Sequence, residues 1–304
     1  MTRTQSVMAQ APSPMAQKRI HSGDSGFNEG MRTWKSMASA QPAASRQAAA
    51  AMLLVFCLGL GAVAQSPNSL LDSATVAEQY LFSAANQERA SRGLPVLRRD
   101  PQLARAATQH ARAMAAHGTI SHQFAGEAEL TDRGASAGVP FSEISENVGE
   151  AGNVVQIHDM WMHSEHHRTN LLDPAIDSAG ISVIQRGNEF YAVEDFAKTV
   201  RTVGLDEQES AIASLIAQRS RLSLASGSES VSAARQTCAM STGFAGGRKP
   251  WFVMRFTSDS LTQIPDQLKT ELASKQYREA AVGACASGRQ SPFTSYNFAV
   301  LLYP

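Results

Sequence analysis

Histidine is the residue type whose distribution first points to chemistry in this chain. Seven of its eight histidines fall between residues 110 and 167, and none lies beyond that stretch. Imidazole titrates near neutral pH and is the commonest metal ligand in proteins. Acid–base or metal chemistry is therefore expected in this part of the chain. The seven residues are His110, His117, His122, His158, His163, His166 and His167.

Helices and one hairpin are predicted around these histidines. Apolar spacing predicts helices over 76–91, from the N-cap Asp100 to Gly118, and from Asn153. His110 falls within the apolar stripe of the second helix, so a packed histidine bonded to backbone is favoured there. Residues 179–196 alternate around a glycine turn, which is typical of a β-hairpin. Helices before strands favour an α+β fold, and no glycine-rich phosphate loop opens a helix.

A series of short motifs in fixed order resembles the CAP superfamily, which includes cysteine-rich secretory proteins, antigen 5 and plant pathogenesis-related proteins. The resemblance covers about 120 residues and is to the bacterial branch, which lacks the many cysteines of eukaryotic members. The motifs are Asn86-x-x-Arg89-x-x-x-Gly93-Leu94-x-x-Leu97, Asp100-Pro101-x-Leu103, Ser121-His122, Glu146-Asn147, Trp161-Met162-x-Ser164, His167-Arg168-x-Asn170-Leu171-Leu172, Gly180-Ile181-Ser182-Val183 and Asp195-Phe196.

The resemblance implies a CAP-type α-β-α sandwich and a candidate site. In many family members two histidines and two glutamates line a cleft and can hold a divalent ion. By position, His122, Glu146 and His167 match three of these ligands, and Ser164 stands where eukaryotic members have the second glutamate. Two imidazoles and one carboxylate can hold zinc or another divalent metal with a position open for water.

The serine at position 164 weakens the hypothesis of hydrolysis more than the hypothesis of metal binding. A glutamate there would supply charge or a base for the metal-bound water, whereas serine offers only a neutral hydroxyl. His163, Glu165 and His166 crowd the same segment and are candidate substitutes. Ser164 with His167 has the composition of a nucleophile and a base, but no orienting acid accompanies them.

Three functions remain open at this point, and the incomplete ligand set leans away from an enzyme. The first is a secreted, non-catalytic binding protein whose partner is an extracellular or envelope lipid, glycan or protein. The alternative is a metal-dependent hydrolase, such as a peptidase, acting at the same cleft. The third is an envelope adhesion protein that acts through its C-terminal part. A shared fold does not decide among them.

The N-terminal 64 residues have the pattern of a leader. An uncharged apolar run covers residues 48–64, basic residues precede it, and Ala62-Val63-Ala64 offers a cleavage site. We expect export and cleavage after Ala64, with an uncleaved membrane anchor as the alternative.

The net charge and the number of cysteines differ between the whole chain and the part that follows the leader. The chain has 304 residues, 27 basic and 27 acidic, of which the leader holds six and two. The remaining 21 basic and 25 acidic residues make a nucleic-acid partner improbable on electrostatic grounds. Cys238 and Cys285 remain, and in an exported chain they are expected to form a disulfide worth about 4 kcal/mol at most; two buried thiols are the alternative.

Three parts are expected: a leader (1–64), a CAP domain (75–200) and a small α/β module of no recognised family (205–304), with a boundary near residue 203. In the module we predict a helix around Ile212, strands over 251–257 and 296–303, and a helix from Pro265 to about Ala281. The two cysteines are expected to join the loop before the first strand to the loop after this helix.

Overall fold

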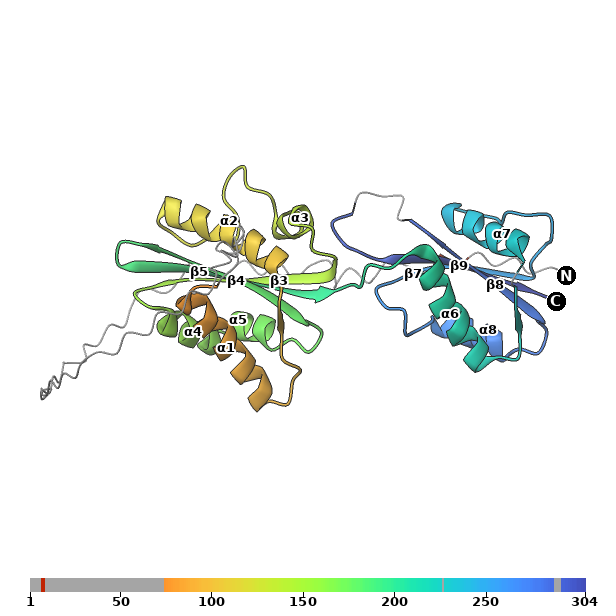
Figure 1. Cartoon of the computed structure of the whole chain (residues 1–304), viewed down its shortest axis with the longest axis horizontal. Coiled ribbons are helices and arrows are strands. Elements are labelled where there is room, and N and C mark those ends of the chain that lie inside the picture. Colours follow the sequence, from red (N-terminus) through yellow and green to blue (C-terminus); the bar gives the residue numbers. More distant parts are fainter. Residues whose placement is uncertain (1–6, 9–73, 226, 287–290) are drawn as a thin grey trace, which may run out of the picture. The chain divides into compact units, whose positions relative to one another are not determined.

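The computed structural model describes residues 7–8, 74–225, 227–286 and 291–304, and Figure 1 shows their arrangement. The predicted leader segment at residues 48–64, with its cleavage site, lies outside the described residues. No helix within the described ranges is long and apolar enough to cross a membrane. The strands form two separate sheets. The division into two domains near residue 203 stays a prediction.

The first sheet lies between two layers of helices, as the resemblance implies (Figure 1). Its strand order is β2-β4-β5-β3, and β5 pairs antiparallel with both neighbours. The strands are β2 (Arg98–Arg99), β3 (Phe141–Ala151), β4 (Ser178–Arg186) and β5 (Glu189–Thr199). Helices α2 (Pro101–His117) and α3 (Leu130–Ser136) cover one face. Helices α1 (Val76–Ser91), α4 (Val154–His163) and α5 (Glu165–Leu171) cover the other.

Local signals explain most of these boundaries. Thr75 caps α1 with a capping box that involves Glu78, and Asp100 accepts hydrogen bonds from two backbone amides at the start of α2. Helix α2 ends at Gly118, whose φ of 69° is left-handed. Asn153 caps α4, as predicted. Strand β3 and helix α3 have no such local signal, because the sequence after Gly118 is polar and glycine-rich to about residue 145.

The second sheet has the order β1-β7-β9-β8-β6. Its strands are β1 (Val7–Met8), β6 (Ser223–Leu224), β7 (Phe252–Ser258), β8 (Glu279–Cys285) and β9 (Tyr296–Tyr303). Helices α6 (Leu205–Arg219) and α8 (Asp266–Ala273) pack on one face through an apolar cluster, and α7 (Ser228–Ala239) packs on the other. This region is therefore a small α/β module, as predicted, with helices on both faces of its sheet.

One predicted element of this module is wrong in part, and one element was not predicted. Helix α8 ends at Ala273 instead of continuing to about Ala281, and residues 279–285 form strand β8. The run Ala280 to Ala284 is buried on both sides, so its alanines carried no strand periodicity. Helix α7 was also missed, since its serine-rich start resembles a loop.

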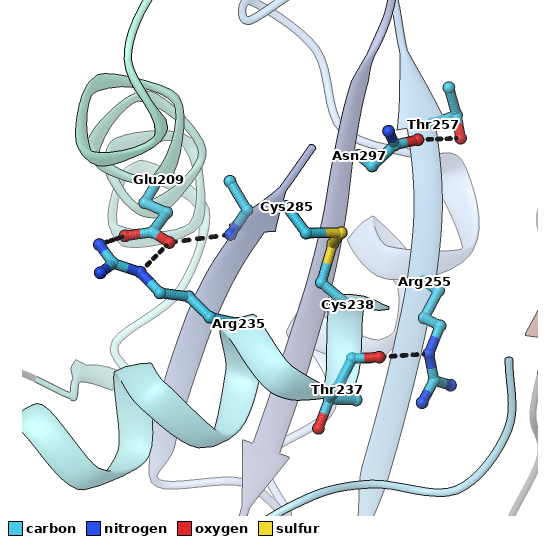
Figure 2. The surroundings of a disulfide bond; sticks show 9 residues. Glu209, Arg235, Thr237, Cys238, Arg255, Thr257, Cys285 and Asn297 are labelled. Atoms are coloured by element: carbon cyan, nitrogen blue, oxygen red, sulfur yellow. Dashed lines mark hydrogen bonds and ion pairs between the residues drawn. A yellow bond between two sulfur atoms is a disulfide. The ribbon is translucent and has the colours of Figure 1, made fainter. Parts of the chain in front are cut away.

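The predicted disulfide between Cys238 and Cys285 is present, with the two Cα atoms 5.8 Å apart. Its location differs from the prediction, because Cys238 lies near the end of helix α7 and Cys285 at the end of strand β8. The bond therefore joins a helix to a strand and not two loops (Figure 2). Arg255 donates a hydrogen bond to the carbonyl of Thr237, beside the disulfide.

Candidate functional site

The predicted site residues come from four places in the CAP region. His122 lies in the segment that follows α2, and Glu146 lies in the middle of β3. Ser164 caps the N-terminus of α5, and His167 follows in the first turn of that helix. The structure brings His122 into direct contact with Glu146, and the charge of His122 acts on His167.

Glu146 is the centre of a buried polar cluster. Its side chain is only 2% exposed. His122 Nδ1 donates to Oε1 over 2.9 Å, and Arg133 donates to Oε2. Burial alone would raise the pKa of Glu146, but the hydrogen bond from His122 and the charges of Arg133 and His110 hold that pKa below its usual value. Glu146 is therefore an ionised carboxylate with both oxygens engaged.

The segment that carries His122 is tied to the helices on both sides of it. His110 is fully buried in α2; its Nε2 donates to the carbonyl of Ser121, and its Nδ1 lies 2.7 Å from Glu127 Oε1. The second oxygen of Glu127 accepts from the amide of Phe124. Arg133 also donates to the carbonyl of His122. The prediction that His110 is a packed histidine bonded to backbone is confirmed.

Two further buried acids were not singled out as site residues. Asp195 and Glu194 are neighbours on β5, directly across from Glu146 and Asn147 on β3. Both are completely buried. Asn147 is the polar side chain beside Glu194, and Glu146 is the one beside Asp195. Burial raises the pKa of Glu194 to about 8, and burial with the charge of Glu146 raises the pKa of Asp195 well above its usual value. Glu194 is therefore mostly protonated at pH 7, and the pKa of Asp195 is shifted in the same direction.

The opposite face of the sheet holds a network of amides. Asn147 donates to the backbone carbonyl of His167, and Asn170 donates to the carbonyl of Glu146 and to Oδ1 of Asn147. These bonds hold α5 against β3. Asn147 and Asn170 therefore brace helix α5 behind the site.

His167 is a neutral imidazole at pH 7. Burial, with the nearby positive charges of His122 and His166, lowers the pKa of His167 to about 4. Its Nδ1 is buried without a hydrogen-bond partner. An unpartnered buried nitrogen is costly, by about 1–3 kcal/mol, and such atoms are concentrated at functional positions.

The other polar residues of the α4–α5 junction do not join this cluster. The His163 ring is 79% exposed and contacts Asp159, one turn earlier in α4. Glu165 and His166 are exposed. Ser164 is half-buried, and its hydroxyl makes no hydrogen bond with any described residue. The expected substitution of the lost glutamate by one of these neighbours therefore finds no support in the geometry.

A metal ion does not fit this arrangement of side chains. Both oxygens of Glu146 are taken by His122 and Arg133, and the histidine nitrogen nearest to that carboxylate is also engaged. Among the residues that the structure describes, no three His, Cys, Asp or Glu side chains are grouped so as to hold a metal. Zinc at His122, Glu146 and His167 would need rearrangement of a buried ion pair. It stays a prediction, to be tested by titration.

The pair of His122 and Glu146 has the arrangement of a general base and the acid that orients it. A carboxylate on Nδ1 orients an imidazole and leaves Nε2 able to accept a proton or a hydrogen bond. No serine, threonine or cysteine side chain within the described ranges bonds to His122. The base and its orienting acid are thus present, without a nucleophile in contact.

Several other motif residues are scaffold. Arg89 is fully buried and donates to four carbonyls, at Pro95, Leu171, Asp173 and Ile176. It therefore organises the turn after α1 and the segment after α5. A Cβ on Gly180 would lie 2.1 Å from the amide nitrogen of Ala104, so glycine is required where α2 crosses β4.

The comparisons with known proteins agree with this fold. The family model of the cysteine-rich secretory protein (CAP) family matches residues 82–196. The uncharacterized protein YkwD of Bacillus subtilis is 26% identical over 117 residues, which are 38% of this chain and 46% of YkwD. The chain thus spans about half the length of this curated relative.

Solved structures of bacterial SCP-domain proteins are also similar. An extracellular SCP-domain protein of Bacillus anthracis is 26% identical, with a TM-score of 0.39 and 44% of each chain covered. An outer surface protein of Borrelia burgdorferi is 20% identical, with a TM-score of 0.40, and the match covers 42% of this chain and 96% of that one. The family match and the three-layer sandwich together identify residues 82–196 as a CAP domain.

Proposed function

We propose that this protein is an extracytoplasmic binding protein that holds its ligand at the surface formed by His122 and His167, without chemical turnover. The observation that carries the proposal is the state of Glu146, whose two oxygens are both engaged inside the protein. A carboxylate in that state positions His122 but is not free to take a proton from water. The ligand is a glycan, lipid or protein of the cell exterior.

The proposed location has separate support. The apolar run at residues 48–64 with its small-residue cleavage site is typical of export. A disulfide persists in oxidising compartments and is rare in the cytosol. Cell fractionation with N-terminal sequencing tests this, and we expect a mature chain that begins at Gln65. Recovery of an uncleaved chain from the cytosol would contradict it.

Binding and catalysis can be tested in one experiment. The purified chain is presented to neutral oligosaccharides, phospholipid vesicles and unstructured peptides by surface plasmon resonance, while the same mixtures are analysed for products by mass spectrometry. We expect saturable binding to one class that weakens at least tenfold in His167→Ala, with no product. Product formation that is lost in both His122→Ala and Glu146→Gln would instead establish the hydrolase.

A further inference from the structure

One end of the second sheet brings together four chain segments that are distant in the sequence. The carbonyl of Arg278, just before β8, accepts hydrogen bonds from the amide and the hydroxyl of Ser223 on β6. The amide of Arg278 donates to the carbonyl of Tyr303 at the end of β9. The amide of Trp251, just before β7, donates to the carbonyl of Leu302. Neighbouring strands lie about 4.8 Å apart, so these segments meet within about 15 Å.

Basic side chains accumulate at this end of the sheet. Of the acids near it, Glu279 pairs with Arg248, and Glu271 accepts from the hydroxyl of Tyr277. Glu229, at the start of α7, is the third acid there. Four further cations on or beside the four segments are exposed, and none of them forms an ion pair with any described residue. They are Arg221, Lys249, Lys275 and Arg278. We call these four residues, with Trp251, the basic end; its five cations, Arg248 included, outnumber the three acids.

Exposed apolar side chains lie at the same end. Trp251 is 49% exposed, and Leu224, which follows Ser223 on β6, is 37% exposed. An indole ring is favoured at the boundary of a lipid bilayer, where its apolar body meets acyl chains while its N–H stays hydrated. Binding at such a boundary depends on buried apolar area together with attraction to anionic lipid. A soluble polyanion would use the cations but leave both apolar side chains in water.

We propose that the basic end docks the protein on an anionic phospholipid surface, with Trp251 among the headgroups and the four cations facing the phosphates. Lys and Arg side chains close to such a surface each add to the attraction, which falls off within a Debye length. The C-terminal region thereby holds the chain at a membrane without spanning it. This role is separate from the proposed ligand surface of the CAP domain.

Vesicle sedimentation tests the attraction. The probes are vesicles of phosphatidylcholine alone and of phosphatidylcholine mixed with phosphatidylglycerol. The chain is used from Gln65 onward, because the apolar leader segment would itself bind lipid; apart from β1, all described helices and strands lie within it. We expect binding to the anionic vesicles alone, with an affinity that falls as salt is added. Equal binding to both kinds of vesicle, or binding that salt does not weaken, would overturn the proposal.

Paired charge variants test the location. Lys249→Gln with Arg278→Gln is expected to weaken binding to the anionic vesicles by about tenfold or more. Arg105→Gln with Arg112→Gln removes the same charge from exposed positions on α2 and is the matched control, which should leave the affinity nearly unchanged. Equal losses would show that net charge alone matters, and no loss in the first pair would exclude the basic end. Circular dichroism verifies that both variants fold.

Tryptophan fluorescence tests the contact with lipid. The chain from Gln65 onward holds two tryptophans, and Trp161 is buried. The emission of Trp251 should shift to shorter wavelength on anionic vesicles, and Trp251→Phe should remove that shift. If heparin binds as tightly as the vesicles and the emission does not shift on lipid, the surface is a site for soluble polyanions and the proposal is wrong.

The ligand surface of the CAP domain serves as an independent control. His167→Ala should leave vesicle binding unchanged, because the basic end shares no residue with that surface. Loss of vesicle binding in His167→Ala would overturn the assignment of docking to the basic end.

Discussion

The CAP region and the C-terminal region have similar architectures, but they bury different kinds of side chain. Each has a sheet between helices, with antiparallel central strands and short parallel edge strands. In each, a helix crosses a strand at a glycine: α2 at Gly180 and α7 at Gly283, where a Cβ would lie 2.2 Å from the backbone of Ala234. The CAP region, however, buries Glu146, Glu194, Asp195, Arg133 and His110 around its sheet. The C-terminal region buries an almost wholly apolar core and adds a disulfide.

The difference in buried side chains indicates different roles: the C-terminal core serves stability, whereas the buried charges of the CAP region serve the candidate site. Apolar burial and a disulfide stabilise a fold without the desolvation of charges. Buried ions are costly unless each is paired. The CAP region pairs Glu146, and burial raises the pKa values of Glu194 and Asp195, which favours their uncharged forms. Such an arrangement is hard to explain by stability alone. It is explained if the buried charges hold His122 and the neighbouring surface in one geometry.

Removing Arg133 is expected to have the largest effect. Arg133→Met leaves Glu146 as a buried charge without its cation, and we expect a loss of about 3–5 kcal/mol in the free energy of unfolding, measured by urea denaturation. Adding Glu146→Gln should recover part of it.

The matched control lies in the other region. Arg235 pairs with Glu209 and Asp206, but its side chain is 42% exposed (Figure 2). Arg235→Met is expected to lose less stability than Arg133→Met, because solvent screens the charge of Arg235, although Glu209 itself is only 10% exposed and also accepts from the amide of Ala284. Equal losses in the two variants would break the comparison between the regions.

Removing the disulfide is the second test. Cys238→Ser with Cys285→Ser is expected to lose about 2–4 kcal/mol, since the unfolded chain regains the freedom of the closed loop. Hydrogen exchange by mass spectrometry should show faster exchange in α7 and β8 and unchanged exchange in α2. Equal acceleration in α2 would show that the disulfide stabilises both regions together.

The third test uses pH. Glu194, with a pKa of about 8, keeps its proton in the folded state, whereas the unfolded carboxyl has lost it above about pH 5. The folded state thus binds more protons, and stability falls as pH rises towards 8. His167, with a pKa of about 4, acts in the opposite sense, but only below about pH 6.5.

The effect of Glu194 on stability is therefore best measured between about pH 6.5 and 8, where His167 no longer contributes. There Glu194 alone contributes up to about 1.4 kcal/mol of lost stability per pH unit, and Asp195 acts in the same direction. Denaturation midpoints across this window should fall with pH, and Glu194→Gln should reduce the slope. A slope that is unchanged in Glu194→Gln would contradict neutral burial of this acid.

Zinc addition is expected to give the smallest measurable change of these tests. Calorimetric titration should show no site in the wild type that is tighter than in a His122→Ala, His167→Ala double variant, because Glu146 is engaged by Arg133. Tight binding that disappears in the double variant would establish the metal site implied by the family resemblance.

The elements that could be predicted from sequence are those with local signals. The caps at Asp100 and Asn153, the hairpin turn at Gly187 and the pairing of Cys238 with Cys285 are all present. Strand β8 and helix α7 were missed because a buried alanine-rich strand has no alternation and a serine-rich helix start resembles a loop. Both are decided by packing against the rest of the sheet.

The candidate site divides in the same way. The motif order located His122 and Glu146, which do contact each other. Arg133 was not foreseen, since nothing in a seven-residue helix marks one arginine as the partner of a strand residue 13 positions later. Two acids in an otherwise apolar strand, Glu194 and Asp195, were the available signal for buried charge.

By itself, the sequence determined the family motifs, the capped helices, the histidine-rich stretch and the cysteine pair, because each depends on residue type and local spacing. Only the tertiary structure decided that Glu146 is bound from both sides and that the pKa values of Glu194 and Asp195 are raised. The physical reason is that a carboxyl group's charge depends on burial and on neighbours distant in the chain. His122 is thereby held in one orientation against Glu146.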